Sequence, residues 1–349
     1  MIINARFLSQ KLSGVQRFSI QTSIEIKKQF PEATFVTPKN ILHKEIAEKL
    51  DAKVIGSFTG HLWEQIDLMT YCKKNKKLLL CLGNTGPILY KNKIITLHDI
   101  AYIKFQDSFS KSFSKFYQFF IPQIIKSSKH ILTVSNFSKS EIASYYKINP
   151  RKISVIYNAA DQKFQKLKRK TSEKYILSLS NINKQKNLIS LIKAFQRLNR
   201  NDIKLYIIGA SNKNFNNYNL DDENISHDNI VFLGGNLSDS QVIQYYSDAM
   251  FFAFLSLYEG FGIPPLEAQS CGTPVLLSNI PVFNEIYGDS ALYCDSLDID
   301  DISKKLNLLI ENQNLRSEMQ KKGFKNLLKY SWNNSAKNIL NTINSLDEK

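Results

Sequence analysis

The chain has 349 residues, of which 43% are hydrophobic and 22% charged, a composition typical of a globular protein long enough for two domains. It contains no run of eighteen apolar residues, and its first residues lack the apolar core of a signal peptide, so we expect neither a membrane-spanning helix nor a secretion signal. The four cysteines form no CxxC pair, which predicts reduced thiols in a cytoplasmic protein without a disulfide or zinc site.

The net charge of +15 is concentrated in the first half of the chain. Residues 1–160 contain 24 Lys and Arg against 10 Asp and Glu, whereas residues 161–349 contain 22 against 21. Such a basic region favours an anionic partner: nucleic acid, an anionic membrane or a small anionic molecule. Because no RRM, KH or zinc pattern accompanies it, we expect no nucleic acid and favour peripheral attachment to an anionic membrane surface, on the inner face of the cell membrane. Base composition of the genome would explain the many lysines, but not their asymmetry.

The first half is patterned as a doubly wound α/β domain. Residues 1–5 are expected to form a strand, 6–15 a loop that carries Gly14, and 16–30 an amphipathic helix. Further strands are predicted at 34–36, 53–55, 78–82, 93–97, 131–134 and 153–157. His98 follows one of these strands, and the carboxyl end of a parallel strand faces the crevice where ligands bind. On its own, His98 is better explained as a histidine that hydrogen-bonds the backbone and holds a loop.

Aromatic residues and lysines alternate through residues 105–130. Four phenylalanines recur there at helical spacing, namely Phe109, Phe113, Phe116 and Phe120. We expect this face to pack against the core, with an amphipathic helix lying on a membrane as the alternative. A little later, Ser138 with Glu141 three residues on predicts a capping box at the start of a helix. Residues 163–174 are polar and rich in lysine, and we place the domain boundary there.

The most informative stretch runs from residue 250 to residue 295. An apolar strand at 250–255 is followed by a glycine-containing loop with Glu259 in it, a helix starting at Pro264–Pro265, and another strand. Glycines let backbone N–H groups approach a ligand, and the start of a helix attracts anions. Glu259 and Glu267 would repel a phosphate but would accept hydrogen bonds from hydroxyls. The stretch therefore predicts a ligand that is both phosphorylated and rich in hydroxyls, such as a nucleotide sugar; a surface turn with two solvated glutamates is the alternative.

The sequence Glu-Gly-Phe-Gly-Ile-Pro-Pro-Leu-Glu-Ala at 259–268, followed by Cys-Gly-Thr-Pro-Val at 271–275, resembles the donor signature of family 4 glycosyltransferases. These are retaining enzymes of the GT-B fold, an α/β architecture with two Rossmann-like domains facing across a cleft and a C-terminal helix that returns to the first domain. The resemblance implies that Glu259 contacts hydroxyls of the donor sugar and that Glu267 takes the nucleotide ribose. It also implies that sugar and phosphate are held by the backbone amides of Gly260, Phe261, Gly262 and Ile263.

Other positions match the family less completely. The resemblance places His98 at the family's active-site histidine and Gly14 near the donor diphosphate. In the family, the turn after the first strand of the second domain carries an arginine and a lysine that hold the diphosphate. Lys186 matches the lysine, but Asn181 stands in the place of the arginine, which removes a charge and a two-pronged donor and puts the strength of donor binding in doubt unless Lys184 compensates. A surface lysine and an ordinary turn are the alternatives for Lys186 and Gly14.

The resemblance implies an acceptor-binding domain at residues 1–165, a nucleotide-sugar-binding domain at 170–330 and a returning helix at 331–349. The expected reaction transfers a hexose or deoxyhexose from a nucleoside-diphosphate sugar to a hydroxyl of a glycan or lipid-linked glycan, with retention, in polysaccharide biosynthesis. We expect no cofactor and no metal, because the DxD motif at 298–300 precedes an amphipathic helix and is interpreted as a helix cap. A nucleotide-sugar 2-epimerase of the same architecture, and a basic membrane or nucleic-acid binding protein with a degenerate site, are the alternatives.

Overall fold

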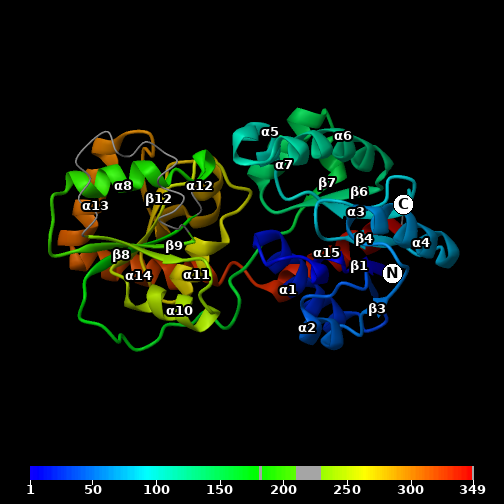
Figure 1. Cartoon of the computed structure of the whole chain (residues 1–349), viewed down its shortest axis with the longest axis horizontal. Helices are drawn as coiled ribbons and strands as arrows, with labels where there is room; N and C mark the ends of the chain where they lie inside the picture. Colours follow the sequence, from blue (N-terminus) through cyan, green and yellow to red (C-terminus); the bar gives the residue numbers. More distant parts are fainter. Residues whose placement is uncertain (181–182, 210–228, 348–349) are drawn as a thin grey trace. The chain divides into compact units, whose positions relative to one another are not determined.

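The computed structural model describes residues 1–180, 183–209 and 229–347. The chain divides into two compact units: unit 1 is Met1–Asn158 together with Tyr330–Lys349, and unit 2 is Ala159–Lys329. Each unit is built around its own parallel β-sheet with helices packed against it (Figure 1). Among the described residues, no helix combines the length and the apolar character needed to cross a bilayer.

The sheet of unit 1 has seven strands in the order β3-β2-β1-β4-β5-β6-β7. They are β1 (Ile2–Asn4), β2 (Thr34–Thr37), β3 (Lys53–Val54), β4 (Leu79–Cys81), β5 (Lys93–Thr96), β6 (His130–Thr133) and β7 (Ile153–Val155). The predicted strands are confirmed, and the apolar residues at the centres of β1, β4, β5 and β6 follow from burial on both faces of a parallel sheet. The strand order reverses between β1 and β4, and a reversal of this kind opens a crevice at the carboxyl ends of the strands.

The helices of unit 1 include one from the far end of the chain. They are α1 (Gly14–Gln29), α2 (Lys44–Lys49), α3 (Gly60–Trp63), α4 (Met69–Asn75), α5 (Ala101–Lys104), α6 (Lys111–Ser127), α7 (Asn136–Tyr146) and α15 (Trp332–Asp347), with a π-helix at Glu64–Leu68 between α3 and α4. Helix α15 packs on α1, where the rings of Trp332 and Phe18 lie 6.0 Å apart. The predicted return of the C-terminal helix to the first domain is therefore confirmed.

Helix α6 buries a different face from the one that the phenylalanine spacing predicted. Phe113 is 37% exposed and the other three phenylalanines of that face are only half-buried, so the prediction that this face packs into the core is wrong; Phe119, outside that face, is 64% exposed. The side chains that α6 buries are Ser114, Tyr117, Ile121, Ile124 and Ile125. Both faces of the helix are apolar, and the isoleucines of its second half decide which of them is covered. The phenylalanines stack on ring neighbours instead, with Phe113 4.2 Å from Tyr117 and Phe116 4.1 Å from Phe120.

The loop expected at residues 6–15 is partly helical. Arg6–Ser9 form a 3₁₀ helix, and Gly14 is the first residue of α1, directly after the N-cap Ser13. The prediction that Gly14 lies in a loop is therefore wrong, because the helix begins two residues before its predicted start at residue 16. Ser13 and Gly14 do not define the helix start on their own, because serine and glycine are both common at the N-cap position.

The start of α7 also differs from the prediction. The hydroxyl of Ser135 accepts a hydrogen bond from the backbone N–H of Ser138 at 3.0 Å, so Ser135 is the N-cap and Ser138 lies inside the helix. Glu141 forms an ion pair with Lys104 at 2.9 Å instead of completing a capping box. Both serines satisfy the local rule for an N-cap, and the end of β6 fixes which of them is used.

The sheet of unit 2 has six strands in the order β10-β9-β8-β11-β12-β13. They are β8 (Tyr175–Leu179), β9 (Lys204–Ile208), β10 (Ile230–Gly234), β11 (Phe251–Phe254), β12 (Val275–Ser278) and β13 (Leu292–Cys294). The order reverses between β8 and β11, as it does between β1 and β4 in unit 1. The strand predicted at 250–255 is confirmed as β11, and the strand predicted after the following helix is confirmed as β12.

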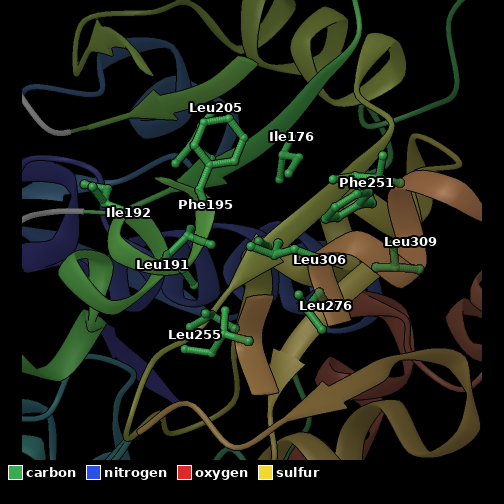
Figure 2. Close-up of a cluster of buried hydrophobic side chains, with 14 of the residues drawn as sticks. Ile176, Leu191, Ile192, Phe195, Leu205, Phe251, Leu255, Leu276, Leu306 and Leu309 are labelled. Atoms are coloured by element: carbon green, nitrogen blue, oxygen red, sulfur yellow. The ribbon is translucent and has the colours of Figure 1, made fainter. Parts of the chain in front are cut away.

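The described helices of unit 2 cover both faces of this sheet. They are α8 (Leu188–Arg197), α10 (Asp239–Asp248), α11 (Ile263–Ser270), α12 (Pro281–Tyr287), α13 (Ile299–Glu311) and α14 (Gln313–Leu327). Figure 2 shows the core in which Leu191 and Phe195 of α8 and Leu306 of α13 meet the sheet. Burying each such side chain contributes about 1.5–3 kcal/mol, so this core holds the loops at the ends of the strands in place.

The DxD sequence is a helix cap, as predicted. The carboxylate of Asp298 accepts hydrogen bonds from the backbone N–H groups of Asp300 at 2.8 Å and Asp301 at 3.2 Å, at the start of α13. These bonds satisfy two of the N–H groups that the first turn of a helix leaves without partners.

Candidate active site

The loop between β11 and α11 is shaped by a glycine that no other residue could replace without strain. Gly262 has φ +88°, and a Cβ atom there would lie 2.7 Å from Cε1 of Phe283. Its carbonyl accepts a hydrogen bond from the hydroxyl of Tyr287, so this residue of α12 fixes the position of the N-cap of α11. The helix begins at Ile263, one residue before the predicted Pro264. Its proline pair removes two of the first N–H groups, which leaves the loop amides as the main backbone donors at this end.

A second loop, after β8, is tied to the first. Gln185 lies in a 3₁₀ helix, Lys184–Lys186, that the side chain of Asn183 caps. Its Nε2 donates to the carbonyl of Tyr258 at 2.9 Å, and its own carbonyl accepts from the backbone N–H of Leu257 at 2.8 Å. Because Gln185 is buried, these two bonds hold the loops after β8 and β11 at a fixed separation.

The consequence is that Lys186 and Glu259 meet. Nζ of Lys186 lies 2.5 Å from Oε1 of Glu259, and also 5.3 Å from the ring centre of Phe254. The side chains are 25% and 13% exposed, so both charges remain accessible from solvent. The pair lies at the carboxyl ends of β8 and β11, where the strand order of unit 2 reverses, the usual place for a ligand in a doubly wound sheet. An ammonium beside a carboxylate here can bind a phosphate and a hydroxyl of one ligand.

The remaining residues of the predicted motif line the same segment. Gly260, Phe261 and Ile263 are buried, and Glu267 on α11 is 4% exposed. The structure thus brings Lys186, Glu259 and the glycine loop together, and places Glu267 on the helix that the loop leads into. Asn181 lies outside the described residues.

His98 and Gly14 belong to unit 1. His98 follows β5 and is 6% exposed; its Nε2 donates to the carbonyl of Leu82 at 3.0 Å. The hydroxyl of Ser19, on α1, donates to the same carbonyl at 3.1 Å. The loop after β4 is therefore held both by His98 and by α1, the helix that begins at Gly14. Burial lowers the pKa of His98 to about 4, against a smaller opposite effect of the Leu82 carbonyl. The imidazole is therefore neutral at pH 7, with its proton on Nε2 and Nδ1 left as an acceptor.

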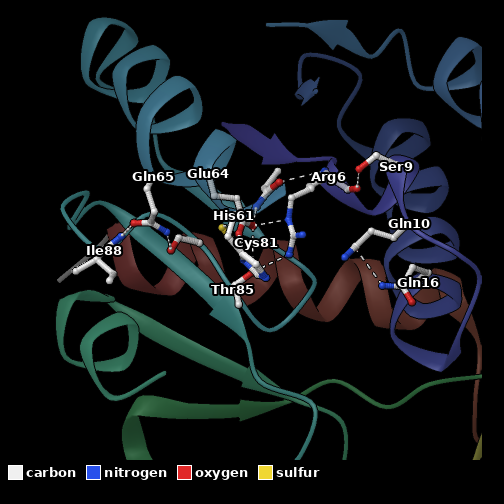
Figure 3. A network of polar contacts seen from close by, with 12 residues as sticks. Arg6, Ser9, Gln10, Gln16, His61, Glu64, Gln65, Cys81, Thr85 and Ile88 are labelled. Carbon is white, nitrogen blue, oxygen red and sulfur yellow. Dashed lines mark hydrogen bonds and ion pairs between the residues drawn. The ribbon is translucent and has the colours of Figure 1, made fainter. Parts of the chain in front are cut away.

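Sequence patterns missed a polar cluster in unit 1, shown in Figure 3. Glu64, the first residue of the π-helix, is 1% exposed, and its Oε1 lies 2.7 Å from Nδ2 of Asn4 and 3.1 Å from Nε of Arg6. Its Oε2 accepts from the hydroxyl of Thr85 at 2.8 Å and from Nδ1 of His61 at 3.0 Å. Part of this cluster could have been predicted from the sequence, because Arg6 directly follows the first predicted strand, just as His98 directly follows a later one.

The charge state of Glu64 is set by its neighbours. Burial alone would raise the pKa of this carboxyl, but the charge of Arg6 and the hydrogen bonds from His61 and Asn4 outweigh it and lower the pKa to about 2. The carboxylate is therefore ionised and is an acceptor only: Asn4, His61 and Thr85 donate hydrogen bonds to it, and Arg6 forms an ion pair with it.

Comparison with known proteins identifies the family. Residues 159–326 match the family model described as glycosyl transferases group 1, and residues 85–164 match glycosyltransferase family 4. The O-antigen chain mannosyltransferase RfbU of Salmonella typhimurium is 34% identical over 310 residues, which cover 84% of this chain and 86% of the relative. The chain belongs to glycosyltransferase family 4. It is therefore a retaining glycosyltransferase, and the O-antigen chain mannosyltransferase B of Escherichia coli is a further relative, 26% identical over 75% of this chain and 74% of its own length.

Solved glycosyltransferase structures share its fold. Anabaena HepE, solved in complex with UDP and glucose, superimposes with a TM-score of 0.73 at 16% identity over 99% of both chains. A glycosyltransferase from Rickettsia africae gives 0.71 at 17% identity, over 99% of this chain and 98% of the other. This family 4 member therefore has the GT-B fold.

Proposed function

We propose that the chain transfers a mannosyl residue from a nucleoside-diphosphate sugar to a hydroxyl of a growing surface polysaccharide. The observation that carries this proposal is the Lys186–Glu259 pair beside the loop that Gly262 shapes. The sugar is inferred from the relatives, since the Salmonella and Escherichia coli proteins described above are named as O-antigen chain mannosyltransferases, and a further Escherichia coli relative is named as the serotype-specific mannosyltransferase WbdA.

The residues of unit 2 suit the donor. Glu259 accepts hydrogen bonds from the hydroxyls of the donor sugar, and Glu267 from the nucleotide ribose. Lys186 and the amides of residues 260–263 bind the diphosphate, on which negative charge develops as the sugar leaves. Donors held in place before the reaction are effective because they need no rearrangement in the transition state.

The transfer retains the anomeric configuration by displacement on the front face. The bond between the anomeric carbon and the diphosphate oxygen breaks, a bond to the acceptor oxygen forms, and the acceptor proton passes to the departing phosphate. In unit 1, His98 and Gly14 are assigned to the donor sugar and the diphosphate. Because His98 is neutral, its unprotonated Nδ1 can accept a hydrogen bond from a sugar hydroxyl.

Unit 1 is assigned to the acceptor, carried on a lipid at the inner face of the cell membrane. The excess of positive charge in residues 1–160 supports an anionic membrane surface as a partner. The exposed phenylalanines of α6 support the same partner, because Lys111 and Lys115 lie among them on the same helix. Aromatic rings next to lysines are typical of helices that lie in a membrane interface.

A thermal-shift screen against UDP, GDP, dTDP and ADP, and then against their sugars, tests the donor site. A nucleotide present at 100 times its dissociation constant stabilises the protein by about 2.7 kcal/mol, which raises the melting temperature measurably. We expect one nucleotide and its sugar to shift the melting temperature, with GDP and GDP-mannose as the first candidates. Absence of a shift with every nucleotide at millimolar concentration would contradict the proposal.

A further inference from the structure

The cluster around Glu64 in unit 1 has one member that reaches the surface. Arg6 and Glu64 are 9% and 1% exposed, whereas the side chain of His61 is 33% exposed. The ring of His61 lies 4.6 Å from that of Phe116 on α6. His61 is therefore the residue through which this buried polar network, drawn in Figure 3, has contact with solvent.

The network decides which atom His61 presents. Its Nδ1 donates to Oε2 of Glu64, an ionised carboxylate that cannot donate in return. In the neutral imidazole the other nitrogen, Nε2, is then an acceptor. Among the described residues, none forms a hydrogen bond with Nε2 of His61. A carboxylate that fixes a histidine through one nitrogen and leaves the other for a substrate is a common arrangement in enzymes.

Two further features of the backbone point to a ligand at this place. The cluster joins Asn4 at the end of β1 to Thr85 just after β4, and the strand order of unit 1 reverses between these strands. Ligands of doubly wound sheets bind at such reversals. Glu64 also begins a π-helix, a rare irregularity that is frequent at functional sites.

We propose that His61, oriented by the Arg6–Glu64 pair, binds the acceptor glycan by accepting a hydrogen bond from a sugar hydroxyl through Nε2. This inference rests on the proposed function and assigns to unit 1 a specific contact with the acceptor. The ring of Phe116 beside His61 provides an apolar surface for a face of the same sugar. The ionised carboxylate keeps Nδ1 as the donor, so Nε2 of the neutral imidazole is the atom that accepts from a hydroxyl.

Two substitutions separate binding from a structural role. In His61→Asn, the side-chain amide takes the place of Nδ1 and still donates to Glu64, but Nε2 is lost. In His61→Gln, the amide takes the place of Nε2, but the contact with Glu64 is lost. If His61 binds the acceptor, the asparagine variant fails and the glutamine variant retains part of the function; if it only supports the fold, the pattern reverses.

The measurement is the KM for octyl α-mannoside, octyl galactoside and octyl N-acetylglucosaminide with the donor found in the thermal-shift screen, at saturating donor. For the best of these acceptors, we expect His61→Asn to raise KM by at least about tenfold, the factor that 1.4 kcal/mol represents. Its KM for the donor, its melting temperature and its hydrolysis of the donor without acceptor should match those of the wild type. His43→Asn, a change to a histidine of unit 1 whose ring contacts the carbonyl of Gln10, is the control.

The outcomes distinguish this inference from the proposed function. A wild-type acceptor KM in His61→Asn, or a loss confined to His61→Gln with a lowered melting temperature, would overturn the role of His61 while leaving donor binding untouched. A wild-type protein that hydrolyses the donor but transfers to none of the three glycosides would overturn the assignment of a sugar hydroxyl as the ligand. A protein that binds no nucleotide sugar would overturn the proposed function and this inference together.

Discussion

Each unit places a cation and a carboxylate at the reversal of its strand order, but the two pairs differ in their contact with water. Lys186 and Glu259 in unit 2 are 25% and 13% exposed, whereas Arg6 and Glu64 in unit 1 are 9% and 1% exposed. A pair that retains contact with solvent can exchange its partner for a ligand at low cost. A buried pair cannot, because separating it would leave a charge without a partner in an apolar interior. A pair of opposite charges thus suits a binding site in one unit and a rigid support in the other.

The largest effect is expected from breaking the buried pair. Glu64→Ala leaves the charge of Arg6 buried without a counter-ion, and should destabilise the protein by about 3–5 kcal/mol. The free energy of unfolding, measured with denaturant, checks this value. Glu318→Ala is the control, because Glu318 also pairs with a lysine, Lys322, but is 60% exposed. A loss below about 1 kcal/mol for Glu64→Ala would contradict the description of the pair as a rigid support.

The same pair predicts how stability depends on pH. The pKa of Glu64 is lowered from 4.5 to about 2 by folding, so the native state favours the ionised form. Its contribution is therefore complete above pH 4.5 and is lost as the pH falls towards 2. Unfolding measured between pH 5 and pH 2 should show a smaller dependence on pH in Glu64→Gln than in the wild type.

The accessible pair should affect the reaction and leave stability unchanged. Glu259→Ala removes the carboxylate that we propose contacts the donor sugar, and we expect the turnover number to fall about a hundredfold or more, by analogy with the loss of one preorganised group in other active sites. The melting temperature should stay the same, because Glu259 lies in a loop and its charge partner remains solvated. Wild-type turnover in this variant would remove Glu259 from the mechanism.

Lys186→Ala should act on nucleotide affinity. A charge-assisted hydrogen bond to the diphosphate contributes about 1.5–3 kcal/mol, so the dissociation constant of the nucleoside diphosphate should rise by roughly tenfold to a hundredfold. Calorimetric titration measures it directly. Lys322→Ala, at a lysine paired with Glu318 on the same unit, is the matched control. An unchanged dissociation constant in Lys186→Ala would contradict its assignment to the phosphate.

The smallest effect concerns the surface of α6. Lys115→Ala should weaken binding to vesicles that contain anionic lipid by about 1 kcal/mol, or roughly fivefold, and should not affect neutral vesicles. Lys49→Ala, on α2 away from α6 in Figure 1, serves as the control. Equal losses of vesicle binding in both variants would show that the membrane is attracted by the total charge of unit 1 and not by a defined surface on α6.

Sequence patterns predicted the strands well because burial on both faces requires a continuous apolar run, which is a local signal. They predicted the loop and helix that carry Glu259 and Glu267 because the glycines, prolines and two glutamates of this segment lie within ten residues. The face of α6 was predicted wrongly, since Phe113 and Ile121 are both apolar and only the neighbouring elements decide which one is covered. The start of α7 was misplaced for a similar reason, because two serines satisfied the same rule.

The contacts between distant residues could not be predicted. Gln185 and Tyr258 are 73 residues apart, and the bond between them fixes how Lys186 meets Glu259. Arg6 and Glu64 lie 58 positions apart in the sequence, and neither belongs to a recognisable motif. The first pair follows from the order of the strands, which places the ends of β8 and β11 side by side, whereas the second also depends on how the π-helix before β4 packs.

The most direct test of the account follows the anomeric proton of the product by NMR, with the donor from the thermal-shift screen and an accepted octyl glycoside. The account predicts a product with the same anomeric configuration as the donor, formed by the wild-type protein and by Glu318→Ala, and formed at least about a hundredfold more slowly by Glu259→Ala. An inverted product, or equal rates in the wild type and Glu259→Ala, would contradict a retaining transfer at the site that Lys186 and Glu259 form.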